Sequence, residues 1–172
     1  MRKMTRYTVD HTKLNKGIYK EKQDGDIIVY DVRTVSPKEM FEGTAEAMDP
    51  KAAHAIEHIG SMLLRNANFQ DKIIYWGPMG GMTGFNLITR DLDIAAVAPY
   101  IRGMMKVIAE WDQDIPATSA KECGNPDYFD LEGAKAIARD FSESVLDFEY
   151  DYFLEKDEIH QPNVLPTVKK TY

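Results

Sequence analysis

The sequence predicts an α+β fold in which an antiparallel sheet packs against helices. Its length of 172 residues corresponds to one globular unit with a core of its own. Hydrophobic residues make up 44% and charged residues 28% of the chain, which excludes disordered and fibrous classes. Strand-like and helix-like segments alternate irregularly, and this favours α+β over a doubly wound sheet. Because no internal repeat or low-complexity linker divides the chain, we expect a single domain over residues 1–172.

The first predicted strand covers residues 27–35, a run rich in β-branched side chains. The turn pair Asp24-Gly25 precedes this run and Pro37 follows it. These boundaries place Arg33 near the end of the strand. Two shorter strands are predicted downstream, over 72–76 and 84–89. The glycine-rich segment 77–83 between them is expected to form a tight turn that joins the two paired strands.

A helix is predicted from Pro50 to about Ala67. Asp49 is a favourable N-cap, and proline is favoured at the first helical position. An apolar stripe recurs at helical spacing along this segment, at Ala53, Ile56, Leu63 and Leu64.

Two more helices are predicted in the second half of the chain. One covers 91–111 and is expected to be interrupted near Pro99 and Gly103. The other begins after the N-cap Asp130 and runs to about residue 145. From about residue 147 the chain is acidic and aromatic, so we expect a peripheral C-terminal extension over 147–172 with a helix and a loose terminus.

Charge and cysteine content limit the partners and the compartment. The chain has 21 basic and 28 acidic residues and a net charge of −7, so neither nucleic acid nor an anionic membrane is an expected partner. The apolar stretch 94–101 is too short to span a bilayer, and the N-terminus lacks the apolar segment of a secretory signal. The single cysteine, Cys123, cannot form an intramolecular disulfide, which is typical of a reducing compartment. We therefore predict a cytoplasmic protein.

His54 and His58 are candidate metal ligands. They lie four residues apart in a predicted helix, so both imidazoles project from one face and can bind one ion. Glu57 stands beside them, as in metallopeptidases with the order His-x-x-Glu-His, where the carboxylate moves a proton. The alternative is a pair of polar histidines on a solvent face. Neighbouring alanine and isoleucine residues favour a position at the buried margin of the helix.

Cys123 is a candidate third ligand. Two imidazoles and one thiolate leave a fourth coordination position open for substrate or water. The alternative is a small buried hydrophobic side chain, as most free cysteines are. Polar neighbours and a tight-loop glycine make that alternative less natural, namely Glu122, Gly124 and Asn125.

Five blocks of the sequence carry a resemblance to a known family, over roughly residues 7–141. They are YTVDHT at 7–12, YDVR at 30–33, HAIEH at 54–58, PMGGMTGF at 78–85, and ECG at 122–124 followed by LEGAK at 131–135. On these blocks the sequence resembles the S-ribosylhomocysteine lyases of the LuxS family.

The resemblance implies a LuxS-like α+β homodimer with its site at the subunit interface. It implies one divalent metal per subunit, Fe(II) or Zn(II), bound by His54, His58 and Cys123. The implied substrate is a small sugar thioether, S-ribosylhomocysteine. Its carbonyl migrates along the ribose and homocysteine is then eliminated, which gives 4,5-dihydroxy-2,3-pentanedione, the autoinducer-2 precursor.

The resemblance also implies roles for individual side chains. Glu57 is the base that removes a proton next to the carbonyl. His11 lines the substrate pocket and donates hydrogen bonds to sugar hydroxyls. Arg33 pairs with the amino-acid carboxylate of the substrate. The alternative for Arg33 is a surface ion pair with Asp31 or Glu39.

Three departures from the family pattern cluster on the predicted pocket. The family has a cysteine, its second acid/base, at the position of Gly81. Arg6 replaces a small polar residue, and Met82 replaces a residue that is commonly basic or an amide. Losing one positioned acid/base costs roughly 10²- to 10⁴-fold in rate. We therefore predict an altered mechanism, in which water fills the space at Gly81 or Arg6 adapts the pocket to an anionic substrate.

Other functions stay open at this point. One is a catalytically weak or inactive metal-binding homologue that acts on or binds a different sugar ligand. A metallopeptidase is less favoured, because the chain has no second lobe to hold a peptide and a cysteine ligand is atypical of that class. The turn 77–83 lacks the residues of a nucleotide-binding loop, so its backbone amides, with Met79 and Gly80 at closest approach, are expected to hold substrate oxygens instead.

Overall fold

The strands and helices follow the order expected of an α+β protein. The structure is a computed structural model that describes residues 9–145 and 150–151. Its strands are β1 (Gly17–Asp24), β2 (Ile27–Arg33), β3 (Ile73–Pro78), β4 (Phe85–Arg90) and β5 (Tyr150–Asp151). Its helices are α1 (Pro37–Phe41), α2 (Pro50–Arg65), α3 (Ile94–Ala109) and α4 (Leu131–Ser144), with short 3₁₀ turns η2 (His11–Lys13) and η3 (Gln70–Lys72).

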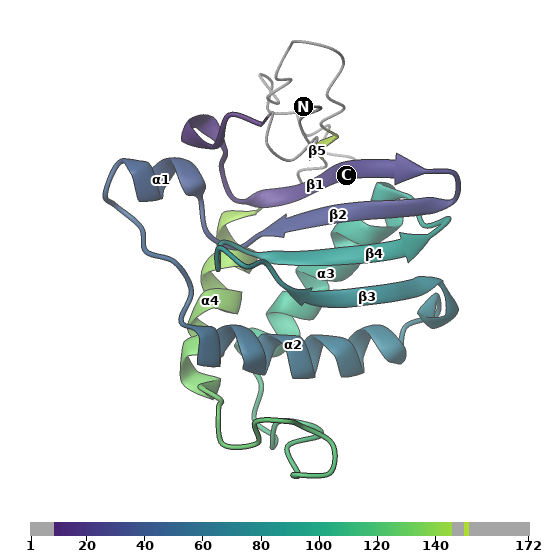
Figure 1. Cartoon of the computed structure of the whole chain (residues 1–172), viewed down its shortest axis with the longest axis vertical. Coiled ribbons are helices and arrows are strands. Elements are labelled where there is room, and N and C mark those ends of the chain that lie inside the picture. Colours follow the sequence, from purple (N-terminus) through teal and green to yellow (C-terminus); the bar gives the residue numbers. More distant parts are fainter. Residues whose placement is uncertain (1–8, 146–149, 152–172) are drawn as a thin grey trace, which may run out of the picture.

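The described strands form one sheet in the order β3-β4-β2-β1-β5. The pairs β1–β2, β2–β4 and β3–β4 are antiparallel, and β5 adds to β1 in parallel. Helices α3 and α4 lie behind the sheet, and α2 runs beside the edge strand β3 (Figure 1). This arrangement confirms the predicted antiparallel sheet packed with helices.

The pairing of β2 with β4 brings the glycine-rich turn to the end of β2. Val32 pairs with Phe85, so the turn that precedes β4 lies beside Arg33. A Cβ atom on Gly84 would collide with the carbonyl oxygen of Val32, and the φ of this glycine is +158°. Only glycine permits so close an approach of the two backbones. The turn therefore cannot move away from β2 without losing this contact.

Helix α2 begins where the sequence predicts. The Asp49 carboxylate accepts a hydrogen bond of 2.7 Å from the backbone N–H of Lys51, and Pro50 occupies the first helical position. The helix ends at Arg65 rather than near Ala67, because the N–H of Asn66 bonds to carbonyls of the preceding turn and its φ of −107° leaves the helical region.

The expected interruption of the helix around Pro99 is wrong. Helix α3 runs through Pro99 and Gly103 without a break. Proline lacks the N–H that would bond to the carbonyl of Ala95, but both residues are exposed, so water can satisfy that carbonyl. Within residues 9–145 and 150–151, every helix is too short or too polar to span a bilayer.

Some elements carried too little local signal to be predicted. Strand β1 buries only its first residues, 17–19, and the rest of the strand is charged or polar. Helix α1 is a single short turn capped by Ser36. In the tail, where a peripheral helix was expected, residues 150–151 form β5. The rest of the predicted extension over 147–172 lies outside the described residues.

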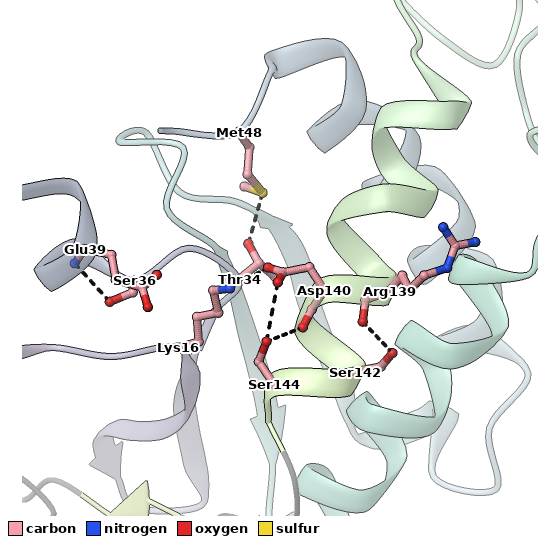
Figure 2. Close-up of polar contacts among 9 residues, drawn as sticks. All are labelled: Lys16, Thr34, Ser36, Glu39, Met48, Arg139, Asp140, Ser142 and Ser144. Carbon is pink, nitrogen blue, oxygen red and sulfur yellow. Dashed lines mark hydrogen bonds and ion pairs between the residues drawn. The ribbon is translucent and has the colours of Figure 1, made fainter. Parts of the chain in front are cut away.

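Side-chain contacts connect the ends of the central strands to the helices, as Figure 2 shows. Lys16 Nζ forms an ion pair of 2.5 Å with Asp140 Oδ2, which joins the start of β1 to α4. The Thr34 hydroxyl donates a hydrogen bond of 3.0 Å to the sulfur of Met48, which joins the segment after β2 to the segment before α2. The first contact helps to fix α4, and the second helps to fix the start of α2, relative to the sheet.

The core lies between the sheet and the three long helices. Its largest fully buried side chains include Tyr30, Phe85, Ile56, Ile101, Met105 and Phe141. Trp76 of β3 stacks on Phe85 with ring centroids 4.7 Å apart. The indole of Trp76 lies directly against α2 at Gly60, where the helix has no side chain. This contact sets how closely α2 approaches the sheet.

We predict that Gly60→Ala destabilises the protein by about 1–3 kcal/mol, because the new Cβ would lie 2.7 Å from Trp76 Nε1 and overpack the core. Gly103→Ala is the matched control, since a Cβ there meets no atom within 4 Å and alanine is the better helix former by about 1 kcal/mol. Urea denaturation measures both free energies of unfolding. A Gly60→Ala protein as stable as wild type would contradict the packing described.

Candidate metal centre

His54, His58 and Cys123 come together in the structure. The two histidines lie one turn apart on α2, and Cys123 lies in the long segment between α3 and α4. Their candidate ligand atoms all lie within 4.8 Å of one another. Cys123 Sγ is 3.6 Å from His54 Nε2. The histidines are half-buried and Cys123 is buried, so the group lies at the margin of the core.

Backbone carbonyls orient both imidazoles. The Nδ1 atom of His54 lies 2.8 Å from the carbonyl oxygen of Tyr128, and that of His58 lies 2.9 Å from the carbonyl oxygen of Pro116. A carbonyl can only accept, so each Nδ1 carries the proton and each Nε2 keeps its lone pair. Histidines that bind metals are held in this way, with the second nitrogen donating to a carbonyl.

The local fold of the loop exposes the sulfur of Cys123 to the histidines. Backbone N–H groups of Glu122 and Cys123 donate to the carbonyl oxygen of Ser119, which closes a tight turn. The N–H of Asn125 donates to Sγ at 3.4 Å and helps to hold the sulfur in place. Two imidazole nitrogens and one thiolate suit a divalent metal such as zinc or ferrous iron. The residues present therefore fit a metal with an open fourth position.

Glu57 is not part of this ligand group. It lies on α2 next to His58 and is half-buried. Its side chain lines a cavity of about 230 Å³ between α2 and β3, together with Ser61, Arg65, Tyr75 and others. The carboxylate is thus adjacent in the helix to the metal ligands and opens onto space that a small molecule or water can enter.

The predicted substrate residues line a second cavity, of about 470 Å³. His11, Arg33, Met79, Gly80 and Gly81 all contribute to its wall. The remaining lining residues are mostly apolar, namely Pro37, Met40, Phe41 and Thr83. None of the three candidate metal ligands lines this cavity. Arg6, which was also predicted here, lies outside the described residues.

Arg33 already has partners inside the protein. Its Nη2 lies 2.6 Å from a carboxylate oxygen of Asp31 and its Nη1 donates to the hydroxyl of Thr83 at 2.8 Å. Asp31 was one of the alternative partners proposed from the sequence, but the pair is buried rather than on the surface, with 1% and 6% of the two side chains exposed. The Nε atom of Arg33 is buried and has no hydrogen-bond partner among the described residues.

His11 is held by the segment that precedes η2. Its Nδ1 lies 3.0 Å from the carbonyl oxygen of Val9. Asp10 caps the turn by accepting hydrogen bonds from the hydroxyl and N–H of Thr12, and the bond from the hydroxyl is the main reason that the pKa of Asp10 lies below its usual value. Asp10 therefore remains an anion beside His11 at neutral pH.

The glycine-rich turn is fixed by its ends and leaves position 81 open. The N–H of Met79 bonds to the carbonyl oxygen of Gly84 at 2.8 Å, and Thr83 and Met82 accept bonds from the segments that follow β2 and precede α2. A Cβ atom on Gly81 would meet no atom within 4 Å, and the same holds for Gly80. Either position can therefore carry a side chain.

Several contributors to the two sites were missed from the sequence. The aromatic ring of Phe129 stacks on His54, and the carbonyls of Pro116 and Tyr128 hold the imidazoles. Phe41, which is 68% exposed, lines the second cavity. No sequence pattern marks these residues, because each contributes through a contact between segments that are distant in the sequence.

We expect Asp31→Asn to destabilise the protein by about 3–5 kcal/mol, since it leaves the Arg33 guanidinium buried without its counter-ion. Asp26→Asn is the matched control, because it removes an Asp–Arg pair of similar length, to Arg90, that is half exposed. Loss of that exposed pair should cost under about 1 kcal/mol. Thermal and urea unfolding compare the two variants, and equal losses would argue against a buried charge pair at Arg33.

Comparison with known proteins agrees with the resemblance found in the sequence. The profile of the family described as S-ribosylhomocysteinase (LuxS) matches residues 4–151. A protein of Desulfotalea psychrophila named S-ribosylhomocysteine lyase is 40% identical over 153 residues, which cover 86% of this chain and 93% of the relative. Proteins with the same name from Clostridium beijerinckii and Phocaeicola vulgatus are 38% and 30% identical, over 85% and 94% of this chain and 92% and 98% of the relatives. The chain belongs to the LuxS family.

Proposed function

We propose that this chain is a metal-dependent carbon–sulfur lyase of the S-ribosylhomocysteine type. The observation that supports it most directly is the convergence of His54, His58 and Cys123, with both Nδ1 atoms held by carbonyls, in a member of the LuxS family. The relatives' name supplies the substrate class, a ribose linked through sulfur to homocysteine. The products are homocysteine and 4,5-dihydroxy-2,3-pentanedione, the autoinducer-2 precursor, and we place the reaction in the cytoplasm.

The proposed metal is a single Fe(II) or Zn(II) ion per subunit. When bound, it supplies Lewis-acid polarisation of the sugar carbonyl. The chain's own part is to present two Nε2 lone pairs and a thiolate from fixed positions and to leave one side accessible. The hydrogen bonds from the Nδ1 atoms of the two histidines to the carbonyls of Tyr128 and Pro116 support this role, because they prevent the imidazole rings from flipping.

Glu57 is the proposed base. Glu57 directly precedes the candidate ligand His58 on α2 and borders a cavity. It would remove the proton from the hydroxyl-bearing carbon next to the carbonyl and return it to the former carbonyl carbon, while the hydroxyl proton passes to the former carbonyl oxygen, which moves the carbonyl along the ribose. In the last step the same group would remove the proton from the carbon between the carbonyl and the sulfur-bearing carbon. The C–S bond then breaks, and the homocysteine thiolate takes up that proton and leaves as the thiol.

The cavity around His11 is the proposed place for the sugar. His11 and the backbone amides of Met79 and Gly80 can donate to hydroxyl oxygens. Arg33 is held by Asp31 and Thr83 through its two Nη atoms, so its proposed contribution is the N–H at Nε, which has no hydrogen-bond partner among the described residues. Arg6 is a further proposed substrate contact.

A homodimer with its site at the interface is part of the proposal. The metal ligands do not line the cavity of His11 and Arg33. This separation supports an arrangement in which the cavity of one subunit faces the metal ligands of its partner, so that sugar and metal meet only in the dimer.

The proposed mechanism differs from that of the family at Gly81. No side chain there can act as the second acid/base, and the space around its Cα is open. A water molecule in this space would carry the proton on that side of the sugar. Water held by backbone groups is a weaker positioned acid than a cysteine, so we expect slow turnover.

The metal-loaded protein is expected to release thiol from S-ribosylhomocysteine, and the metal-free protein is not. His54→Ala and Cys123→Ala should abolish stoichiometric metal binding and turnover together. Glu57→Gln should retain the metal but lower kcat roughly 10²- to 10⁴-fold, since it removes the base. Glu143→Gln, an exposed carboxylate on α4, serves as the control and should match wild type. A thiol-release assay under anaerobic conditions and metal analysis provide the measurements.

Gly81→Cys should raise kcat by roughly 10²- to 10⁴-fold, because it supplies a positioned acid/base in space that is already open. Gly80→Cys places a thiol one residue away in equally open space and should give no comparable gain. Both variants are assayed with the same metal content. An equal rise in both, or in neither, would refute the assignment of position 81.

A second candidate function is a metal-binding homologue that binds a sugar ligand without turnover. Gly81 is the observation that favours it, since the described turn carries no acid/base there. Calorimetric binding of S-ribosylhomocysteine together with no thiol release, even from Gly81→Cys, would establish this function in place of the lyase.

A further inference from the structure

We propose that Phe129 is a positioning residue of the metal centre. Its ring sets the plane of the His54 imidazole so that Nε2 faces Cys123. The inference rests on the metal-binding part of the proposed function and is independent of turnover. Phe129 contacts the ligand residue His54 rather than the metal or the substrate.

Phe129 makes close ring contacts with both histidines. It stacks on His54 with centroids 4.1 Å apart and planes at 12°. It meets His58 edge-on, at 4.9 Å and 77°. The two imidazoles are themselves perpendicular, at 4.6 Å and 89°. The phenyl ring therefore lies parallel to one imidazole and across the other, so both ring orientations are defined against it.

A stacked ring supplies a restraint that the hydrogen bond to Tyr128 cannot. That bond fixes the position of His54 Nδ1 but allows the imidazole to rotate about the N–H···O direction. The lone pair of Nε2 lies in the ring plane, so such rotation would swing it away from Cys123 Sγ, which is 3.6 Å distant. A parallel aromatic face opposes that rotation, because tilting the imidazole would push it into the phenyl ring.

Phe129 is itself held on both sides. The N–H of Asp130 donates to the carbonyl oxygen of Lys51 in the first turn of α2, at 3.1 Å. The carboxylate of Asp130 caps α4 through the N–H of Gly133, at 2.9 Å. On the other side, the ammonium of Lys51 lies 5.4 Å from the centre of the Tyr128 ring. The residue that restrains His54 is thus connected to the same helix that carries His54.

The phenyl ring also gives His54 an apolar neighbour. Phe129 is partly buried and packs against the main hydrophobic core. A ligand that is oriented before the metal arrives loses less conformational freedom on binding. Orientation by Phe129 should therefore appear as metal affinity and as coordination geometry, and both can be measured without substrate.

The test compares Phe129→Leu and Phe129→Met with Phe129→Tyr. Leucine and methionine keep an apolar side chain but lose the flat ring, whereas tyrosine keeps it. We expect zinc affinity, measured by competition with a chromophoric chelator, to fall roughly 10-fold in the first two variants and to stay within about twofold in the third. The absorption bands of the Co(II)-substituted protein should shift in the leucine and methionine variants and be unchanged in the tyrosine variant.

Phe69→Leu is the matched control. Phe69 is also partly buried against the core, but it lies beyond the C-terminal end of α2 and makes its edge-to-face contact with Tyr100 of α3, at 4.8 Å and 74°. Its loss should lower the melting temperature of the metal-free protein to a similar degree and leave zinc affinity and the cobalt spectrum unaltered. A general loss of packing is thereby separated from a loss of ligand orientation.

The proposal is overturned if both ring-deleting variants bind zinc as wild type does with the same cobalt spectrum. It is also overturned if Phe69→Leu weakens zinc to the same extent, or if wild type binds zinc no more tightly than His54→Ala does. Absence of thiol release alongside the expected affinity pattern would overturn the proposed lyase function and leave this inference intact. Thiol release together with unchanged zinc affinity of the Phe129 variants would overturn this inference and leave the proposed lyase function intact.

Discussion

Burial of one face of α2 against the sheet determines where the metal ligands lie. Ile56 and Ile59 are fully buried, and Gly60 lets the indole of Trp76 approach the helix axis. Because neighbouring residues on a helix are offset by a fixed rotation, a helix that turns this face inward must leave His54 and His58 at its margin. The imidazoles are half-buried for that reason, and the segment between α3 and α4 has only to bring one sulfur and two carbonyl oxygens to them.

Much of the fold could be predicted from local signals. The N-caps Asp49 and Asp130, each followed by an apolar stripe, mark α2 and α4 to within a few residues. Local signals failed where the surroundings decide the outcome. Pro99 does not break α3, because its side of the helix faces water. Strand β1 is mostly polar and forms because β2 offers it a partner, which no window of its own sequence shows.

The candidate site also combines residues that local spacing predicts with residues that only contacts between distant segments bring in. The spacing of His54 and His58 is a local property, whereas Cys123 meets His54 across 69 positions and could be assigned only from ligand chemistry and family resemblance. Asp31 was recognisable as a partner of Arg33 because residues two positions apart on a strand lie on the same face. That the pair is buried could not be predicted from the sequence. It depends on the turn before β4 lying beside β2, a contact between segments fifty positions apart. Phe129 was missed for the same reason.

The way in which the turn before β4 is anchored has an evolutionary consequence. Its shape is set by backbone bonds at Met79, Met82 and Thr83 and by the close approach of Gly84 to β2, and none of these contacts uses Gly81. Selection for folding therefore places almost no demand on residue 81. A lineage can lose or regain a reactive side chain there by drift, without passing through an unstable ancestor, so the scaffold and the chemistry of this protein are free to follow separate histories.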